Sequence, residues 1–267
     1  MQIRAGYEVK FDVLQPLSML LMLYTHPSRA ETVEGEQLRV TPFVPVEEFL
    51  DSFGNRCGRI AAMPGPIAIT ADFLVLDTGE FDEANPAAEQ WPVERFPADV
   101  LPFLLPSRYC EVDLLSDIAW NLFGQAPEGW SRVDTICDWV HAHVTFGYEF
   151  ARATKTAWDV YNERQGVCRD FTHLAITLCR AMNIPARYAT GYLGDIGVPP
   201  SSTPMDFSAW FEVFLDGRWY TRDARHNERR IGRILMARGR DAVDAAITTS
   251  FGAANLTGFK VWTDEVK

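Results

Sequence analysis

The sequence predicts an α+β protein, with a β-rich N-terminal region over residues 1–105 and a core that contains helices over residues 106–267. Near the start of the chain, apolar residues alternate with polar or small ones, which is the period-two pattern of a half-buried strand. From about residue 114, apolar residues recur at helical spacing instead. Five prolines between these two patterns predict a linker over Glu80–Ser107.

Strands are predicted wherever the alternation or a short apolar run lies between turn residues. The segment Ile3–Val13 alternates most regularly, and Asp51–Asn55 supplies a turn between two later strands. The remaining strands of the N-terminal region are predicted at Leu17–Thr25, Leu38–Phe43, Arg59–Ala62 and Ile67–Val75. Near the end of the chain, Gly258–Trp262 is a further candidate strand.

Four helices and one hairpin are predicted in the core. The helices are expected at Leu114–Leu122, Val133–Val140 with Ser131 as its cap, Ala157–Arg164 and Cys168–Met182. A loop rich in proline and serine, Val198–Pro204, comes before the hairpin. Its strands are expected at Phe207–Leu215 and Arg218–Asp223, because Asp216-Gly217 between them favours a tight turn.

The composition excludes several classes of function. A net charge of -11 disfavours binding to nucleic acid or to an anionic membrane. The longest apolar run, Leu17–Tyr24, is far shorter than the ~18 residues of a membrane-spanning helix. Charges interrupt the first residues, so we expect no signal peptide and a cytoplasmic location. Five cysteines without a CxxC pair argue against a disulfide framework or a structural zinc site. We expect no cofactor and no metal.

The residue with the clearest chemical potential is Cys168, because it opens the most regular predicted helix. Unpaired N–H groups and a partial positive charge at a helix N-terminus favour a thiolate, so this thiol is expected to be more acidic than a free one. A structural role stays open, because Cys168 lies three residues before Phe171 and shares its buried face. Asp170 is expected to interact with the positive helix end, and His173 to be buried with a hydrogen-bond partner.

A set of motifs follows this helix in a recognisable order. Together they resemble the bacterial type of the transglutaminase-like superfamily, over roughly Ala157–Asn227. The start of the chain, with Gln15-Pro16 and Asp51–Asn55, also resembles the β-rich region that commonly precedes this core, so the resemblance extends over most of the chain. The resemblance implies a papain-like core, in which the helix that carries the cysteine packs on an antiparallel sheet. It also implies that Cys168 is the nucleophile and Asp223 the acidic member of the site. The motifs are Gly166-Val167-Cys168, Ile184–Tyr188, Gly191-Tyr192, Ala209–Val213 and Trp219–Asp223.

The chain departs from the family pattern at one position. The family has a histidine directly before Ala-Trp, whereas this sequence has Ser208. If Leu215 pairs with Arg218, Ser208 lies diagonal to Asp223 on the same face of the hairpin. A serine hydroxyl cannot act as a base near neutral pH. His226 is the candidate replacement, although a bend after Asp223 is required to bring the two side chains together.

Two functions remain open at this stage. The first is a transglutaminase-like cysteine protease or amidase that attacks peptide or glutamine-type amide bonds, with hydrolysis favoured over cross-linking. Cys168 would form a thioester, Asp223 would orient His226 as the base, and the Cys168 N–H would help to stabilise the oxyanion. The second is a degenerate, non-catalytic domain that binds peptides or a protein partner, which Ser208 favours.

Overall fold

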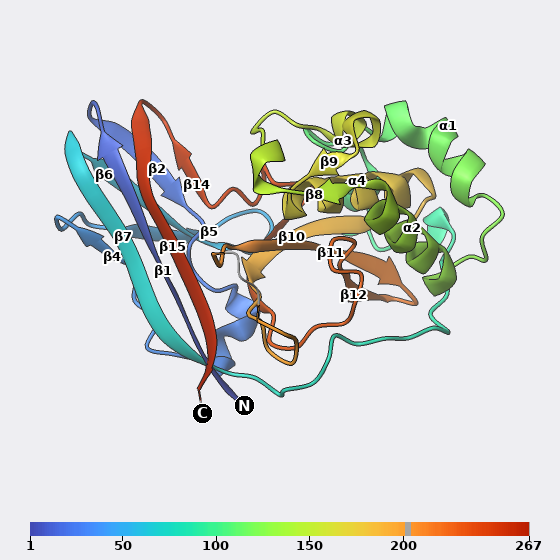
Figure 1. The fold of residues 1–267 in the computed structure, drawn as a ribbon, viewed down its shortest axis with the longest axis horizontal. Helices are drawn as coiled ribbons and strands as arrows, with labels where there is room; N and C mark the ends of the chain where they lie inside the picture. The colour runs from blue at the N-terminus through green and yellow to red at the C-terminus, as the bar shows by residue number, and fades with distance from the viewer. Residues whose placement is uncertain (201–203, 267) are drawn as a thin grey trace.

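The computed structural model describes residues 1–200 and 204–266 and is an α+β fold, as predicted. Figure 1 shows β-sheets on one side of the molecule and a core of helices and strands on the other. The predicted loop Val198–Pro204 lies partly outside the described residues, since 201–203 are not among them. Among the residues described, no helix is long and apolar enough to cross a membrane.

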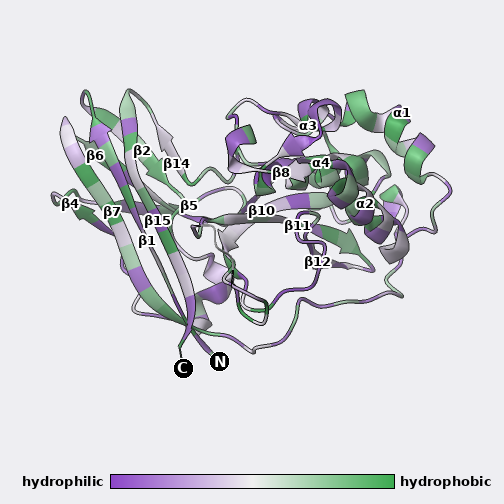
Figure 2. Cartoon of the chain, viewed as in Figure 1, coloured by the Kyte–Doolittle hydropathy of each residue, from purple (hydrophilic) through white to green (hydrophobic). Residues whose placement is uncertain are grey.

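The N-terminal region contains two antiparallel sheets. One has the order β15-β1-β7-β3, with β4 also paired to β7. The other has the order β14-β2-β6-β5. Figure 2 shows the alternation of hydrophobic and hydrophilic residues along β1 and β7 that the sequence predicts. The strands are β1 (Gln2–Val13), β2 (Leu17–Leu21), β3 (Val33–Glu34), β4 (Arg39–Thr41), β5 (Glu47–Leu50), β6 (Arg56–Ala62), β7 (Gly65–Leu76), β14 (Thr248–Ser250) and β15 (Ala254–Val266).

The end of the chain returns to the N-terminal region. Strand β15 pairs along β1, from Gln2 opposite Val266 to Val13 opposite Ala254, and β14 pairs with β2. The N-terminal sheets therefore contain strands from both ends of the chain, so a single domain boundary between residues 105 and 106 would separate β14 and β15 from the sheets to which they belong. The division of the chain into two domains therefore stays a prediction.

The predicted linker contains neither an α-helix nor a named strand over residues 80–107, all of which the structure describes. It has two short 3-10 turns, η2 (Val93–Arg95) and η3 (Leu101–Leu104). The linker runs along the core rather than free of it, because Asp82 accepts hydrogen bonds from Arg230 and Arg233.

The core helices are α1 (Val112–Phe123), α2 (Trp130–His143), α3 (Ala157–Glu163) and α4 (Cys168–Ala181). All four predicted helices are confirmed, but Ser131 does not cap α2. That helix begins one residue earlier, after Gly129, and the Ser131 carbonyl accepts a hydrogen bond from Thr135 inside it. The apolar face of α4 is buried, and the helix contacts the other three helices and two strands of the core sheet.

The core sheet has the order β12-β11-β10-β13 and is antiparallel. Its strands are β10 (Ala186–Tyr192), β11 (Ser208–Leu215), β12 (Arg218–Arg222) and β13 (Ile234–Gly239). The predicted hairpin is confirmed with its register, since Leu215 lies opposite Arg218. Asp216 and Gly217 both have positive φ, 49° and 79°, as a tight hairpin turn requires. A short parallel pair, β8 (Thr145–Phe146) and β9 (Gln165–Gly166), leads into α4.

Candidate active site

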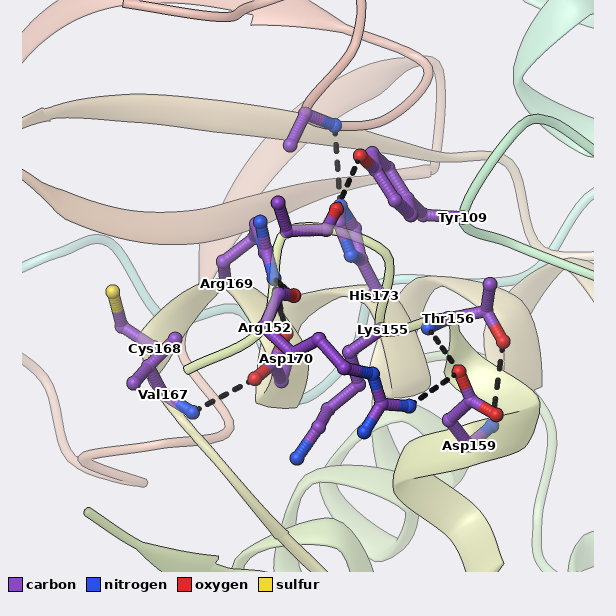
Figure 3. Close-up of polar contacts among 12 residues, drawn as sticks. Tyr109, Arg152, Lys155, Thr156, Asp159, Val167, Cys168, Arg169, Asp170 and His173 are labelled. Carbon is purple, nitrogen blue, oxygen red and sulfur yellow. Dashed lines mark hydrogen bonds and ion pairs between the residues drawn. The ribbon is translucent and has the colours of Figure 1, made fainter. Parts of the chain in front are cut away.

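Cys168 is the first residue of α4, and the residues around it fix the start of that helix. The buried carboxylate of Asp170 accepts a hydrogen bond from the Val167 N–H at 3.0 Å and two from the Arg169 guanidinium, at 3.1 and 3.2 Å. A Cβ at Gly166 would lie 2.6 Å from the Asp170 Cβ, so this approach requires glycine. The expected role of Asp170 at the helix end is confirmed. Figure 3 shows the Cys168 sulfur pointing away from these contacts.

The thiol of Cys168 is less acidic than the sequence led us to expect. Burial raises its pKa to about 11, and the nearby Asp206 carboxylate acts in the same direction. The Arg225 charge and the N–H groups of Ala209 and Arg169 oppose the shift without reversing it. Desolvation of a thiolate and a neighbouring negative charge therefore outweigh the helix N-terminus.

Cys168 opens onto a cleft of about 300 Å³ between α4, the start of β11 and the turn after β12. Ser208 and His226 line the same cleft, so the candidate nucleophile and the candidate base face one space. Among the described residues that line it, His226 is the only histidine. The other lining residues are Phe146, Tyr148, Leu193, Asp195, Val198, Pro199, Asp206, Phe207, Arg225, Glu228 and Arg230.

Asp223 and His226 are joined by a tight turn that directly follows β12. The Asp223 Oδ1 accepts hydrogen bonds from the N–H groups of Arg225 and His226, at 3.0 and 3.1 Å. This bends the chain, and the His226 Nδ1 then lies 2.8 Å from the Asp223 Oδ2. The bend that a pairing of these two residues requires is thus present, built by the carboxylate itself.

The Asp223 carboxylate is buried and ionised. Burial alone would raise its pKa, but Arg233 and His226 more than offset this effect and hold the pKa well below its usual range. The Arg233 Nη2 donates to the Asp223 Oδ2 at 2.9 Å, and its Nε donates to Asp82 at 2.8 Å. A charged Asp223 keeps the proton of a neutral His226 on Nδ1, which leaves a lone pair on Nε2.

That lone pair already has a partner. The Arg225 Nη1 lies 2.9 Å from the His226 Nε2, and only the arginine can be the donor when Nδ1 carries the proton. Among the residues described, no hydrogen bond joins the Cys168 sulfur to His226. The imidazole is therefore oriented like a catalytic base, but the nitrogen that would accept a proton is held by Arg225.

Ser208, which occupies the place of the family histidine, is buried at the start of β11 and lines the cleft. Its hydroxyl has no hydrogen-bond partner among the described residues. The last pair of the β11–β12 ladder is Phe211 opposite Arg222. If the same register continued, the next pair would be Trp210 opposite Asp223, but that pair is not formed. The ladder ends there because Asp223 starts the turn that carries His226.

The other histidines of the core lie in separate environments. His173 is fully buried, stacks on Tyr109 and accepts a hydrogen bond from the Ala242 N–H at 3.1 Å, as expected. His141 and His143 bond to two different carbonyls, those of Arg225 and Tyr161.

Several cleft residues were missed from the sequence. Tyr188 and Tyr192, which belong to the family motifs, are both buried in the core, and Trp158 stacks on Tyr161, so none of the three lines the cleft. The aromatic lining comes from Phe146, Tyr148 and Phe207. The charged residues Asp206 and Arg225 were also missed, although Arg225 lies between the two predicted site residues Asp223 and His226 in the chain.

Comparisons with known proteins agree with this arrangement. The profile of the Transglutaminase-like superfamily matches residues 117–224, which include α4 and the strands β10, β11 and β12. A crystal structure from Cytophaga hutchinsonii, described as a “putative cysteine protease”, is 33% identical with a TM-score of 0.85, over 100% of this chain and 91% of that one.

A curated relative matches over a shorter stretch. An uncharacterized protein of Mycobacterium leprae (strain TN) is 33% identical over 93 residues, which are 33% of this chain and 32% of that protein. The match therefore spans about a third of the length of this relative. From the family profile and the similarity to the Cytophaga structure along the whole chain, we conclude that the protein belongs to the transglutaminase-like superfamily.

Proposed function

We propose that the protein is a thiol hydrolase that cleaves peptide or glutamine-type amide bonds through a thioester on Cys168. The observation that carries this proposal is that Cys168 and His226 open onto one cleft, while the buried Asp223 is hydrogen-bonded to His226 from behind it. The similarity to a structure described as a cysteine protease supports the same class of chemistry. A peptide or protein is the substrate that we propose.

In the first half of the reaction, the Cys168 sulfur attacks the amide carbonyl carbon while His226 Nε2 accepts the thiol proton. His226 then passes this proton to the amide nitrogen, the C–N bond breaks, and an amine leaves a thioester behind. In the second half, water attacks the thioester and gives a proton to His226, which returns it to the departing sulfur. The products are a carboxylic acid, an amine and the free thiol.

The pKa of Cys168 determines how the base must act. With a pKa of about 11, only about 0.03% of the thiol would be ionised at pH 7.5 without help. We therefore propose that His226 removes the proton during the attack, as a general base, rather than holding a preformed thiolate. The Cys168 N–H, in the first turn of α4, has no intrahelical acceptor and is a donor for the oxyanion.

A second candidate function is supported by two observations. Ser208 replaces the family histidine, and Arg225 occupies the proton-accepting nitrogen of His226. Under this alternative, the cleft binds a peptide or a protein partner and forms no thioester. Cys168 would then be a slow thiol, in keeping with its raised pKa.

Alkylation of Cys168 by limiting iodoacetamide near pH 7.5, followed by mass spectrometry, separates the two functions. The proposed hydrolase requires Cys168 to react faster than the same thiol in the unfolded chain. His226→Ala should then slow the reaction strongly, whereas Ser208→His should change it little. His143→Ala is the matched control, because His143 stacks on Trp139 and does not line the cleft.

The alternative function gives the opposite pattern. Native Cys168 would react more slowly than in the unfolded chain, and His226→Ala would have no effect. Ser208→His would raise the rate, because it places an imidazole in the cleft beside Cys168. This pattern would overturn the proposed thiol hydrolase.

A further inference from the structure

Arg225 is a cleft residue whose guanidinium forms no ion pair within the described part of the chain. Its guanidinium lies 4.0 Å above the Phe146 ring, and Nη1 donates to His226. Among the described residues, no carboxylate oxygen forms an ion pair with it. The other arginine of the cleft, Arg230, lies 3.7 Å from both Asp195 and Glu228.

The arginines near Arg225 in the chain differ in their partners, and Arg229 also lacks an ion pair among the described residues, since its Nε donates to the Asp82 carbonyl. Arg222 and Arg233, on either side of Arg225 in the chain, each form an ion pair with aspartate. A partly buried guanidinium without an anion is costly, and the chain as a whole has an excess of acidic residues, with a net charge of -11. The cleft therefore keeps this cation in place without a direct ion pair, and Asp206 acts on it only from a distance.

Hydrogen bonds on both sides of the Arg225 backbone hold this residue in place. Its N–H donates to Asp223 at 3.0 Å, and its carbonyl accepts a hydrogen bond from His141 on α2 at 2.8 Å. The planar guanidinium has five N–H donors, and carboxylates are the groups that match this geometry in two parallel hydrogen bonds. One donor is used by the His226 Nε2, which is a neutral and weaker acceptor than a carboxylate.

We propose that Arg225 binds a carboxylate of the substrate, so that the enzyme selects amides with an acidic group close to the bond that is cleaved. This inference rests on the proposed function. The carboxylate competes with His226 for the guanidinium, so a bound acidic substrate weakens the contact between Arg225 and Nε2 and makes this nitrogen a better acceptor of the thiol proton. Arg225 is then the specificity-determining residue and also restrains the base, less so when an acidic substrate is bound than when the ligand is neutral.

Asp206 opposes this selection to some degree. It lines the same cleft and is close enough to raise the pKa of Cys168. It also acts on Arg225 from a distance, without an ion pair between them. A substrate carboxylate at Arg225 would be repelled by an ionised Asp206, so Asp206→Asn is expected to strengthen the preference for acidic ligands.

The test compares two alkylating reagents of similar size and shape, of which one is charged and one is neutral. Iodoacetate carries a carboxylate, and iodoacetamide is its neutral counterpart. With either one, the sulfur forms a bond to carbon as iodide leaves. The measured quantity is the ratio of the two rates at Cys168, divided by the same ratio for the unfolded chain. One charge-assisted hydrogen-bonded contact corresponds to a preference of about 10- to 100-fold for iodoacetate.

Arg225→Gln should return the normalised ratio to about one. Asp206→Asn should increase it, and Arg218→Gln should leave it unchanged. Arg218 is the matched control because it is exposed, pairs with Glu83 and lies outside the cleft. Protection of the native protein by acetate is a second measurement that needs no variant. Acetate at Arg225 should slow the reaction with iodoacetate, and sodium chloride at the same ionic strength should not.

The outcomes separate this inference from the proposed function. A native ratio equal to that of the unfolded chain, or one that Arg225→Gln does not change, overturns the role of Arg225. The absolute rate with iodoacetamide tests the base on Cys168 independently. A fast iodoacetamide reaction with a ratio of one would leave the thiol hydrolase standing and remove only its preference for acidic substrates.

Discussion

Replacing Asp223 with asparagine tests the centre of the candidate site, because four donors converge on this carboxylate. Oδ1 accepts two backbone N–H groups, and Oδ2 accepts from His226 and Arg233. In Asp223→Asn the amide oxygen can keep the backbone contacts, but its NH₂ group then faces two donors. Breaking a buried charge pair on one side costs about 3–5 kcal/mol. We expect the free energy of unfolding to fall by about this amount at pH 7.

The loss should depend on pH with a definite sign. The pKa of Asp223 is depressed in the folded protein, so its contribution to stability is present above the unfolded pKa of about 3.9 and is lost as the pH falls below it. Below that pKa, each pH unit removes about 1.4 kcal/mol of this contribution. The difference in unfolding free energy between the native protein and Asp223→Asn should therefore shrink from pH 7 towards pH 3.

Urea unfolding at several pH values measures both effects. Asp72→Asn is the matched control, because Asp72 forms a half-exposed ion pair with Arg4 that should contribute less than about 1 kcal/mol. A loss below about 1 kcal/mol for Asp223→Asn at pH 7, or a loss that does not change on acidification, would refute the account of a buried, ionised carboxylate.

Three further predictions concern single residues. Ser208→Ala should lower the free energy of unfolding by less than about 1 kcal/mol, or raise it, in urea unfolding, because the buried hydroxyl that it removes has no hydrogen-bond partner among the described residues. Asn55→Ala should cost about 2–3 kcal/mol in the same assay, because the fully buried Asn55 amide bonds to both the N–H and the carbonyl of Arg238. In His226→Ala, the iodoacetamide rate at Cys168 should rise about tenfold per pH unit between pH 7 and 10, since the thiol pKa of about 11 then governs it.

Elements whose signals lie within a short stretch of chain were predictable. The hairpin around Asp216-Gly217 and the helix that begins at Cys168 both have local patterns, and the structure confirms them. Strands β10 and β13 were missed because both are almost entirely buried and lack alternation. They pair with each other across more than forty residues, as in Tyr188 opposite Gly239, so no local pattern indicates them.

The chemistry of the site was harder to predict than its members. Cys168 and Asp223 follow from the order of the family motifs, and the bend that brings His226 to Asp223 could be stated only as a requirement. The prediction of an acidic Cys168 thiol was wrong. The helix N-terminus is a local feature of the sequence, whereas the burial and the Asp206 charge that raise the thiol pKa come from the folded surroundings. That Arg225 forms no ion pair with a described carboxylate likewise becomes visible only when its neighbours in space are known.

The position of His226 has a consequence for how this site is held together. A histidine on β11 would be fixed by the core sheet, whereas Asp223, Arg225 and His226 all belong to one turn. That turn is braced by α2, through His141 to the Arg225 carbonyl and through Asp138 to Asn227. Cys168 is on α4, which contacts α2. The packing of α2 against α4 therefore sets the distance between the Cys168 thiol and the His226 imidazole. Substitutions of core residues between these two helices should alter the reactivity of Cys168 even though none of those residues lines the cleft.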